Sequence, residues 1–397
     1  MKAVVIGAGR IGCGFVGHLL HRSGHDVCLV GRGPVVDPLK RDGGYVVRVT
    51  DGRTARDERV QGVRCLDVRQ LAEVDNEIST ADVVCTAVGT GALPDVASHL
   101  ATGLAMATHP INVIAFENAE DAGPRLRRLV ADAAGLHTAS RHGFSGAVVS
   151  RVVAQRQLPE RPGDPLLLIG EPNDDFTVDG EALKTPMLDI EGMIAVDDFA
   201  AHFRRKLYRY SAGHATAAYL GHLKGYRYLH AAVRDPEIRW AVRSAIVEGQ
   251  RGLQAQYGAA VAGSPGDADQ ILRRFDNAAL GDTVARVGRD VRRKLGHYER
   301  LIGAASLAER AGVAPVWLAH AAAAALFFHD APPTGSRLDG ALWEITGLQQ
   351  TSPLARRIEE AWLGFSDGWG QGNLLLSLEQ RLWSWSGRPT AQLVGLR

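Results

Sequence analysis

The N-terminus carries the feature that most constrains the fold, three glycines in the pattern Gly-x-Gly-x-x-Gly. They follow an apolar run at residues 3–6 and open a helical pattern at about residues 11–22. In such a strand–turn–helix the first glycine permits the tight turn, the second lets a pyrophosphate approach the backbone, and the third lets helix and strand pack closely. Unpaired N–H groups at the helix start bind the anion. The pattern predicts a dinucleotide-binding loop rather than a purely structural turn, formed by Gly7, Gly9, Arg10, Ile11 and Gly12.

Short apolar runs alternate with helical patterns through the first half of the chain. Nearly continuous runs of Val, Ile and Ala are typical of strands buried on both faces of a parallel sheet. They occur at residues 3–6, 26–30, 82–88 and 111–116. Alternating valines between residues 46 and 68 predict a β-rich excursion from this sheet.

From about residue 197 the pattern becomes helical, and residues 320–326 (HAAAAAL) form helix strongly. Residues 159–172, rich in Pro, Gly and charge, look like a linker or an excursion between the halves. We therefore expect an α/β protein, with a Rossmann-type doubly wound sheet over residues 1–192 and a mainly α-helical catalytic domain over residues 193–397. The active site is expected in the cleft between them. Three tryptophans near the end predict a tail that docks on the body: Trp369, Trp383 and Trp385.

Composition excludes several classes of partner. Lys+Arg 45 against Asp+Glu 44 gives a net charge of +1, so no overall field attracts the chain to nucleic acid or to an anionic membrane. No apolar run reaches the ~18 residues of a membrane span, and no secretory leader opens the chain. Four cysteines without a Cys-x-x-Cys pair predict buried thiols in a reducing, cytoplasmic setting: Cys13, Cys28, Cys65 and Cys85. The 14 histidines are scattered and His-Glu-x-x-His is absent, so we expect no metal site.

The end of the second strand bears on the choice of cofactor. NAD-specific sites carry Asp or Glu there to hold the ribose 2′-hydroxyl. This chain reads Val-Gly-Arg-Gly instead, so no acid repels a 2′-phosphate and Arg32 can pair with one. The sequence favours NADP over NAD, although Arg32 as one more solvated arginine is the alternative.

Lys206 and His214 lie eight residues apart in a helical context. At ~100° per residue of α-helix their directions differ by roughly 80°, so both can line one wall. A buried lysine with a lowered pKa can act as a general base toward an alcohol, and an imidazole beside it can orient the same hydroxyl. A solvated lysine and a packed core histidine remain the alternatives.

Around these residues the chain resembles the polyol-specific long-chain dehydrogenase/reductase family. The similar segments run in order from residue 1 to about 363: residues 7–15 (GAGRIGCGF), 86–89 (TAVG), 114–118 (IAFEN), 205–208 (RKLY), 213–215 (GHA), 218–221 (AYLG), 274–277 (RFDN), 286–289 (RVGR), 293–295 (RKL) and 300–302 (RLI). The resemblance implies Lys206 as general base, His214 as the group that orients the substrate, and Asn118 as the group that polarises the reacting oxygen. Asn118 as a mere strand-end cap is the alternative. The matching cofactor contacts are Ala87, Val88, Gly89 and Asn118.

Two positions depart from the family pattern. An asparagine five residues after the lysine is here Ser211, and the aspartate of Val-Asp-Arg-Ile is here Ser150. Ser211 can still donate one hydrogen bond to an alkoxide. Because the other expected groups remain, we favour a changed substrate over a decayed enzyme.

A basic stretch at residues 286–294 predicts a place for a substrate phosphate, because Arg286, Arg289 and Arg293 share one face if the stretch is a single helix. A solvated face is the alternative. The expected substrate-binding residues are Ser150, Arg151, Arg289 and Lys294.

These observations predict an NAD(P)-dependent, metal-independent oxidoreductase. It would interconvert a polyol, such as mannitol 1-phosphate, and its ketose by hydride transfer, as a monomer or homodimer. A same-fold enzyme acting on a cyclitol or modified sugar and a non-catalytic nucleotide-binding sensor are the alternatives.

Overall fold

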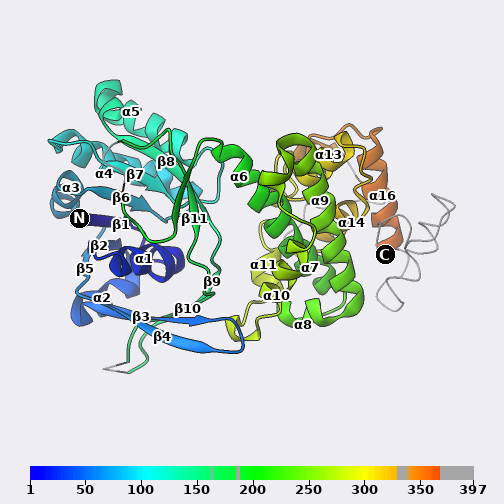
Figure 1. Cartoon of the computed structure of the whole chain (residues 1–397), viewed down its shortest axis with the longest axis horizontal. Helices are drawn as coiled ribbons and strands as arrows, with labels where there is room; N and C mark the ends of the chain where they lie inside the picture. The colour runs from blue at the N-terminus through cyan, green and yellow to red at the C-terminus, as the bar shows by residue number, and fades with distance from the viewer. Residues whose placement is uncertain (162–163, 185–187, 329–337, 339, 367–397) are drawn as a thin grey trace. The chain divides into compact units, whose positions relative to one another are not determined.

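The apolar runs of the first half form the centre of an eight-stranded sheet in the computed structural model, which describes residues 1–161, 164–184, 188–328, 338 and 340–366 (Figure 1). Its strands, in spatial order, are β12 (Met193–Val196), β11 (Phe176–Asp179), β8 (Gly143–Val149), β7 (Asn112–Ala115), β6 (Val83–Thr86), β1 (Lys2–Ile6), β2 (Asp26–Gly31) and β5 (Arg64–Asp67). From β8 to β5 every neighbouring pair is parallel, and only β11 pairs antiparallel, with β8. The predicted doubly wound parallel sheet is confirmed.

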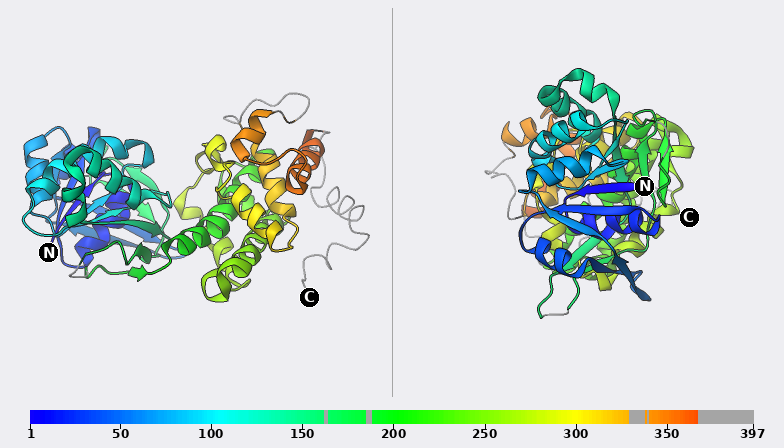
Figure 2. Two further views of the ribbon diagram at one scale, coloured as in Figure 1. Left: turned by 90° about the horizontal axis from the view of Figure 1, so that it is seen from above. Right: turned by 90° about the vertical axis from the view of Figure 1, so that its left-hand side faces the viewer.

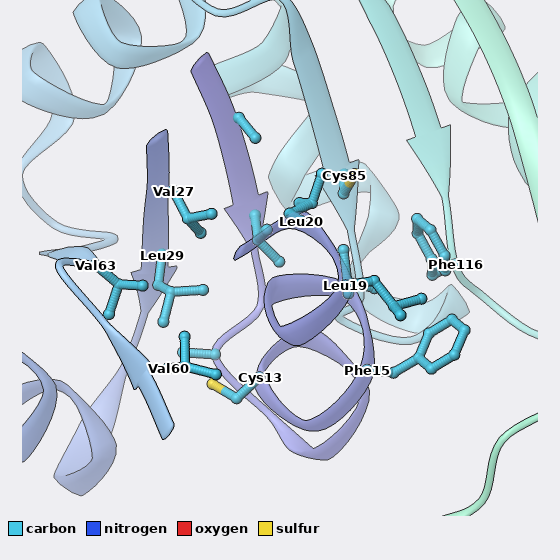
Figure 3. Close-up of a cluster of buried hydrophobic side chains, with 14 of the residues drawn as sticks. Cys13, Phe15, Leu19, Leu20, Val27, Leu29, Val60, Val63, Cys85 and Phe116 are labelled. Carbon is cyan, nitrogen blue, oxygen red and sulfur yellow. The ribbon is translucent and has the colours of Figure 1, made fainter. Parts of the chain in front are cut away.

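Both faces of this sheet are covered, which explains the continuous apolar runs. In β1, Ala3 and Val5 belong to one buried cluster, whereas Val4 and Ile6 belong to another. The first cluster packs under the helical segment η1 (Gly12–Gly17) and α1 (His18–Arg22), which contributes Phe15 (Figure 3). The opposite face is covered by α3 (Leu71–Ser79), α4 (Leu93–Met106) and α5 (Ala122–Arg141) (Figures 1 and 2).

A second sheet of four strands accompanies the first, in the order β4 (Ala55–Gln61), β3 (Gly44–Thr50), β10 (Leu167–Gly170) and β9 (Val153–Gln157). The predicted β-rich excursion is confirmed by β3 and β4. The sequence predicts a linker or an excursion at residues 159–172, and the linker alternative is wrong. They contain β10, which pairs with β3 and β9, and Leu168 within it is fully buried.

The chain divides into two compact units, Met1–Phe203 and Arg204–Arg397. The strand β12 belongs to the first sheet, so this sheet extends beyond residue 192, where the sequence predicted the first domain to end. Short helices complete the first unit: η2 (Gly33–Val35), α2 (Val36–Asp42) and η3 (Thr90–Ala92). The helix α6 (Phe199–Arg205) spans the division.

The second unit is helical in all its described elements, as predicted. They are η4 (Lys206–Ser211), α7 (Ala212–Leu223), α8 (Leu229–Arg234), α9 (Pro236–Ala262), α10 (Asp267–Phe275), η5 (Ala278–Leu280), α11 (Val284–Gly288), α12 (Val291–Lys294), α13 (Ile302–Arg310), α14 (Val316–Ala325), α15 (Gly340–Thr346) and α16 (Pro353–Ser366). The long α9 begins at Asp235, whose carboxylate accepts hydrogen bonds from two N–H groups of its first turn. It packs against α7, α13 and α14, and α14 confirms the predicted helix at residues 320–326.

Other sequence expectations concern single segments. All four cysteines are buried and unpaired, and burial raises the pKa of the Cys13 and Cys28 thiols to about 12. The helices in the described ranges include none with the length and apolar character needed to cross a membrane. Trp369, Trp383 and Trp385 lie outside the described residues.

Candidate active site

The glycine loop connects β1 to the helical segment that follows it, and it is tight at two glycines and open at the third. Gly7 has φ +117°, and a Cβ there would lie 2.5 Å from the Ala87 carbonyl oxygen. A Cβ on Gly12 would lie 1.7 Å from the Gly7 carbonyl oxygen, whereas a Cβ on Gly9 would meet nothing within 4 Å. The protein itself thus requires Gly7 and Gly12. The open space beside Gly9 is what a pyrophosphate needs in order to approach the backbone, so the loop fits a dinucleotide.

The expected cofactor residues are collected at one edge of the sheet. Gly7 follows β1, Arg32 follows β2, residues 87–89 follow β6 and Asn118 follows β7. All these strands are parallel, but the order in which the chain adds them reverses between β1 and β6: β2 and β5 lie on one side of β1, whereas β6 and β7 lie on the other. Ligands of doubly wound sheets bind at the carboxyl edge beside such a switch point. Arg32 and Asn118 are both exposed there.

Two loop side chains turn toward the protein instead. The Arg10 guanidinium donates a hydrogen bond to the Ala154 carbonyl in β9 at 3.0 Å. Ile11 is partly buried and packs on the apolar cluster of the first sheet. Any contact of these two residues with a cofactor would therefore come from their backbone groups.

A buried carboxylate that the sequence reasoning missed stands at the same edge. Glu117 is 2% exposed, and it accepts hydrogen bonds from the Thr86 hydroxyl at 2.7 Å and from the Val88 N–H at 2.9 Å. It thereby fixes the segment after β6 against the end of β7, next to Asn118. Its place after a strand buried on both faces is the signal that could have identified it.

Lys206 begins the π-helical segment η4, and Ser211 ends it. The hydrogen bonds of a π-helix run from residue i to i+5, so each turn is wider than in an α-helix, and Ser211 is turned less far from Lys206 than an α-helix would turn it. The α-helical angle used to relate Lys206 to His214 therefore does not apply. Ser211 is 5% exposed.

Burial, followed by the nearby Arg300 guanidinium, lowers the pKa of Lys206 to about 7, while Glu299 opposes the shift. A lysine in this state is available as a neutral amine near neutral pH. Neutrality of the amine is the property that a general base toward an alcohol needs.

His214 is held by a carboxylate that the sequence reasoning also missed. Its Nε2 lies 3.3 Å from Oδ2 of Asp282, and its ring stacks on Phe275 with centroids 4.9 Å apart. Arg286 donates two hydrogen bonds to Asp282, each of 2.6 Å. Burial raises the pKa of Asp282, but the bonds from His214 and Arg286 outweigh it and hold this pKa well below its usual range. Asp282 thus remains an anion that orients the imidazole.

The basic stretch is not one helix, so the predicted shared face is wrong. α11 ends at Gly288 and α12 begins at Val291, because Asp290 has the left-handed φ of +63°. Arg286 forms an ion pair with Asp282, and Arg289 is exposed. Lys294 is buried and donates a hydrogen bond to the Val287 carbonyl.

Ser150 and Arg151 follow β8 in the first unit. Arg151 is 3% exposed, and its guanidinium contacts the Gly14 carbonyl, the Asn173 carbonyl, His18 and Asp174. These bonds favour a structural role for Arg151, and substrate binding by Ser150 and Arg151 stays a prediction. In the described part of the chain no group of three or more His, Cys, Asp and Glu side chains could hold a metal ion.

A dinucleotide-type glycine loop on a doubly wound sheet, followed by a helical unit with a half-buried lysine of lowered pKa, defines a two-domain Rossmann-type protein. The chain belongs to the mannitol dehydrogenase family: the family's Rossmann domain matches residues 1–192 and its C-terminal domain matches residues 198–371. The family resemblance and the fold class expected from the sequence are confirmed.

Curated relatives match along most of their length. A mannitol-1-phosphate 5-dehydrogenase of Brevibacillus brevis is 34% identical over 391 residues, which cover 92% of this chain and 100% of the relative. A mannitol-1-phosphate 5-dehydrogenase of Pseudarthrobacter chlorophenolicus is 37% identical over 374 residues, 89% of this chain and 95% of the relative. Among solved structures, the ternary complex of Pseudomonas fluorescens mannitol 2-dehydrogenase with NAD and D-mannitol has a TM-score of 0.75 at 15% identity, covering 96% of this chain and 94% of that one. It shows the same fold.

Proposed function

We propose that this protein is a nicotinamide-dependent oxidoreductase that interconverts a polyol phosphate, of the mannitol 1-phosphate type, and its ketose. The observation that carries the proposal is Lys206, a lysine with a pKa of about 7 that begins the π-helical segment ending at Ser211. The glycine loop and the relatives named as mannitol-1-phosphate 5-dehydrogenases support it.

The chemistry divides between the cofactor and the chain. The bound nicotinamide would supply the hydride acceptor or donor. In the direction of oxidation, Nζ of Lys206 takes the proton of the reacting hydroxyl, and in reduction the ammonium returns it. Ser211 donates a hydrogen bond to the oxygen as negative charge develops on it, and the family resemblance implies the same role for Asn118. Asp282 accepts from Nε2 of His214, so Nδ1 is the nitrogen left to accept a hydrogen bond from a substrate hydroxyl.

We further propose NADP as the preferred cofactor. Arg32 is exposed at the end of β2, between Gly31 and Gly33, with no acidic residue beside it in the sequence. A guanidinium there can form charge-assisted hydrogen bonds with a 2′-phosphate.

The test is a substrate panel scored by NADPH and NADH absorbance, with fructose 6-phosphate, fructose, mannitol 1-phosphate and mannitol. Turnover of a polyol phosphate or its ketose phosphate is expected. Tight cofactor binding without turnover of any sugar, cyclitol or phosphate would identify a nucleotide-binding sensor and end the proposal.

Ser150 and Ser211 favour a second candidate, an enzyme of the same fold that acts on a cyclitol or a modified sugar. Both serines stand where the family pattern has larger polar side chains, and they leave room for a differently shaped substrate. Adding cyclitols and amino or deoxy sugars to the panel separates the two candidates.

A further inference from the structure

The linker between α12 and α13 holds a buried arginine that the proposed mechanism does not use. Arg300 is 9% exposed, and its Nε donates to Oε2 of Glu299 at 3.0 Å. Its Nη2 is buried and has no hydrogen-bond partner among the described residues. A guanidinium keeps its charge at all physiological pH values, and a buried N–H without a partner is costly. Arg300 therefore has a donor group suited to an anion that the chain itself does not supply.

The carboxylate that pairs with Arg300 has a second basic partner. Glu299 is shared between two arginines, because its Oε1 also accepts from Arg293 at 2.9 Å. Burial opposes ionisation of Glu299, but Arg300 and Arg293 lower its pKa, so this carboxylate is already neutralised. Lys294 is 5% exposed and donates to a carbonyl rather than to a carboxylate. Arg293 has Asp290 as a second partner, which leaves Glu299 to pair with Nε of Arg300. Nη2 of Arg300 and the amine of Lys294 are therefore the buried donors of this segment that an added anion could pair with.

The same arginine acts electrostatically on the candidate base. After burial, Arg300 is the group that most lowers the pKa of Lys206 and of Lys294. The positive charge of Arg300 thus influences both amines. In a polyol phosphate the reacting carbinol and the phosphate are at different ends of the molecule. Lys206 can serve one end while Lys294 and Arg300 serve the other.

We propose that Arg300, through the N–H groups of its Nη2, and Lys294 bind the phosphate of the substrate and thereby select phosphorylated over unphosphorylated polyols. The inference rests on the proposed function and deepens it. Arg300 forms charge-assisted hydrogen bonds with the phosphate oxygens, and Lys294 adds a point charge. Arg289, the exposed arginine expected from the sequence, is not required for this subsite.

The test compares kcat/KM for fructose 6-phosphate and for fructose in wild type, Arg300→Gln and Arg300→Lys. The preference for the phosphate is expected to fall at least tenfold in R300Q, mainly through KM, and to be partly kept in R300K. Arg310→Gln, an exposed arginine in the last turn of α13, is the matched control and should keep the wild-type preference. A folded R300Q with an unchanged preference overturns the proposal. If R300Q does not fold, Lys294→Gln takes its place and must lower the same preference, or the proposal fails.

A second measurement separates this subsite from the proposed function. Inorganic phosphate should raise the Tm of wild type and R310Q but not of R300Q. If wild type turns over no substrate and phosphate still stabilises it through Arg300, the proposed function fails and the anion site stands. If turnover is normal and phosphate has no Arg300-dependent effect on Tm or on the substrate preference, the anion site fails and the proposed function stands.

Discussion

Nε2 of His214 lies 3.3 Å from Oδ2 of Asp282, and the pair comes from α7 and from the segment that precedes α11. Arg286 fixes the carboxylate through two further hydrogen bonds. The contact places the ring proton on Nε2, so it decides which nitrogen of His214 faces a substrate. Burial lowers the pKa of His214 below its usual value, although Asp282 opposes the shift, and the neutral imidazole is therefore the form to be oriented.

Asp282→Asn tests this relationship. The amide keeps the shape of the side chain but no longer requires a proton on Nε2, so kcat/KM is expected to fall about 10- to 100-fold, as for other partners of functional histidines. Steady-state kinetics and cofactor titration check the expectation, and cofactor affinity should not change. Asp269→Asn, which removes an exposed ion pair with Arg243, is the control and should match wild type. Wild-type turnover in D282N would show that Asp282 does not orient a functional histidine.

Lys206→Ala should remove most turnover, by roughly 10² or more, while cofactor binding stays intact. The pKa of about 7 means that the amine is neutral above pH 7 and charged below it. Alcohol oxidation by the wild type should therefore rise with pH through about 7 and then level off, and this acidic limb should vanish in K206A. pH profiles of kcat/KM measure both effects. Lys184→Ala, at an exposed lysine, should leave the profile unchanged, and a K206A enzyme with wild-type kcat would rule out the assignment.

Alanine at Gly12 should impair folding, whereas alanine at Gly9 should impair cofactor binding. A Cβ on Gly12 overlaps the Gly7 carbonyl oxygen, so Gly12→Ala should lower Tm or prevent folding. A Cβ on Gly9 meets no protein atom, so Gly9→Ala should fold normally but raise the Kd of the cofactor about tenfold or more. Thermal melts and fluorescence titration separate the two results. Normal cofactor binding by G9A would place the pyrophosphate elsewhere.

Arg32→Ala should raise KM for NADPH far more than KM for NADH, by about tenfold or more, because a hydrogen bond to a charged group is worth roughly 1.5–3 kcal/mol. Parallel assays with the two cofactors measure the ratio. Arg53→Ala, at an exposed arginine in the β3–β4 turn, should leave the ratio unchanged. Equal changes for both cofactors in R32A would mean that Arg32 does not contact the 2′-phosphate.

Much of the first sheet is predictable from the sequence, because burial on both faces leaves a local trace. Every residue of Val83–Thr86 and Asn112–Ala115 is buried, and an unbroken apolar run is the direct consequence. β8 escaped prediction because its glycines resemble a loop. A Cβ on Gly146 would lie 2.8 Å from the Phe199 ring, and one on Gly143 would lie 2.2 Å from Oδ1 of Asn112. These glycines are required by contacts with residues far away in the sequence, and a local sequence pattern cannot predict such contacts.

The residues of the candidate site are predictable only where they belong to a contiguous sequence motif. The glycine loop and Lys206 belong to contiguous motifs. Glu117 and Arg300 fall within segments that resemble the family, but their roles, like that of Asp282, depend on hydrogen-bond partners or burial that only the folded chain supplies. The π-helical turn from Lys206 to Ser211 is likewise invisible to a search for a 3.6-residue period.

Replacing Ser211 by asparagine tests whether this residue faces the reacting carbon of the substrate. Ser211 ends the π-helical segment that Lys206 begins, where the family pattern has asparagine, and it is 5% exposed. An amide reaches further from the backbone and supplies two donors, so Ser211→Asn should extend toward the oxygen that Lys206 serves. Combined with Ser150→Asp, it restores the family pattern. We expect kcat/KM for mannitol 1-phosphate, relative to the best substrate of the panel, to rise about tenfold, which corresponds to about 1.4 kcal/mol.

Ser140→Asn, on the exposed side of α5, is the control and should leave the ratio unchanged. If the double variant also leaves it unchanged, Ser211 does not face the reacting carbon, and the family's asparagine position lies elsewhere in this helix.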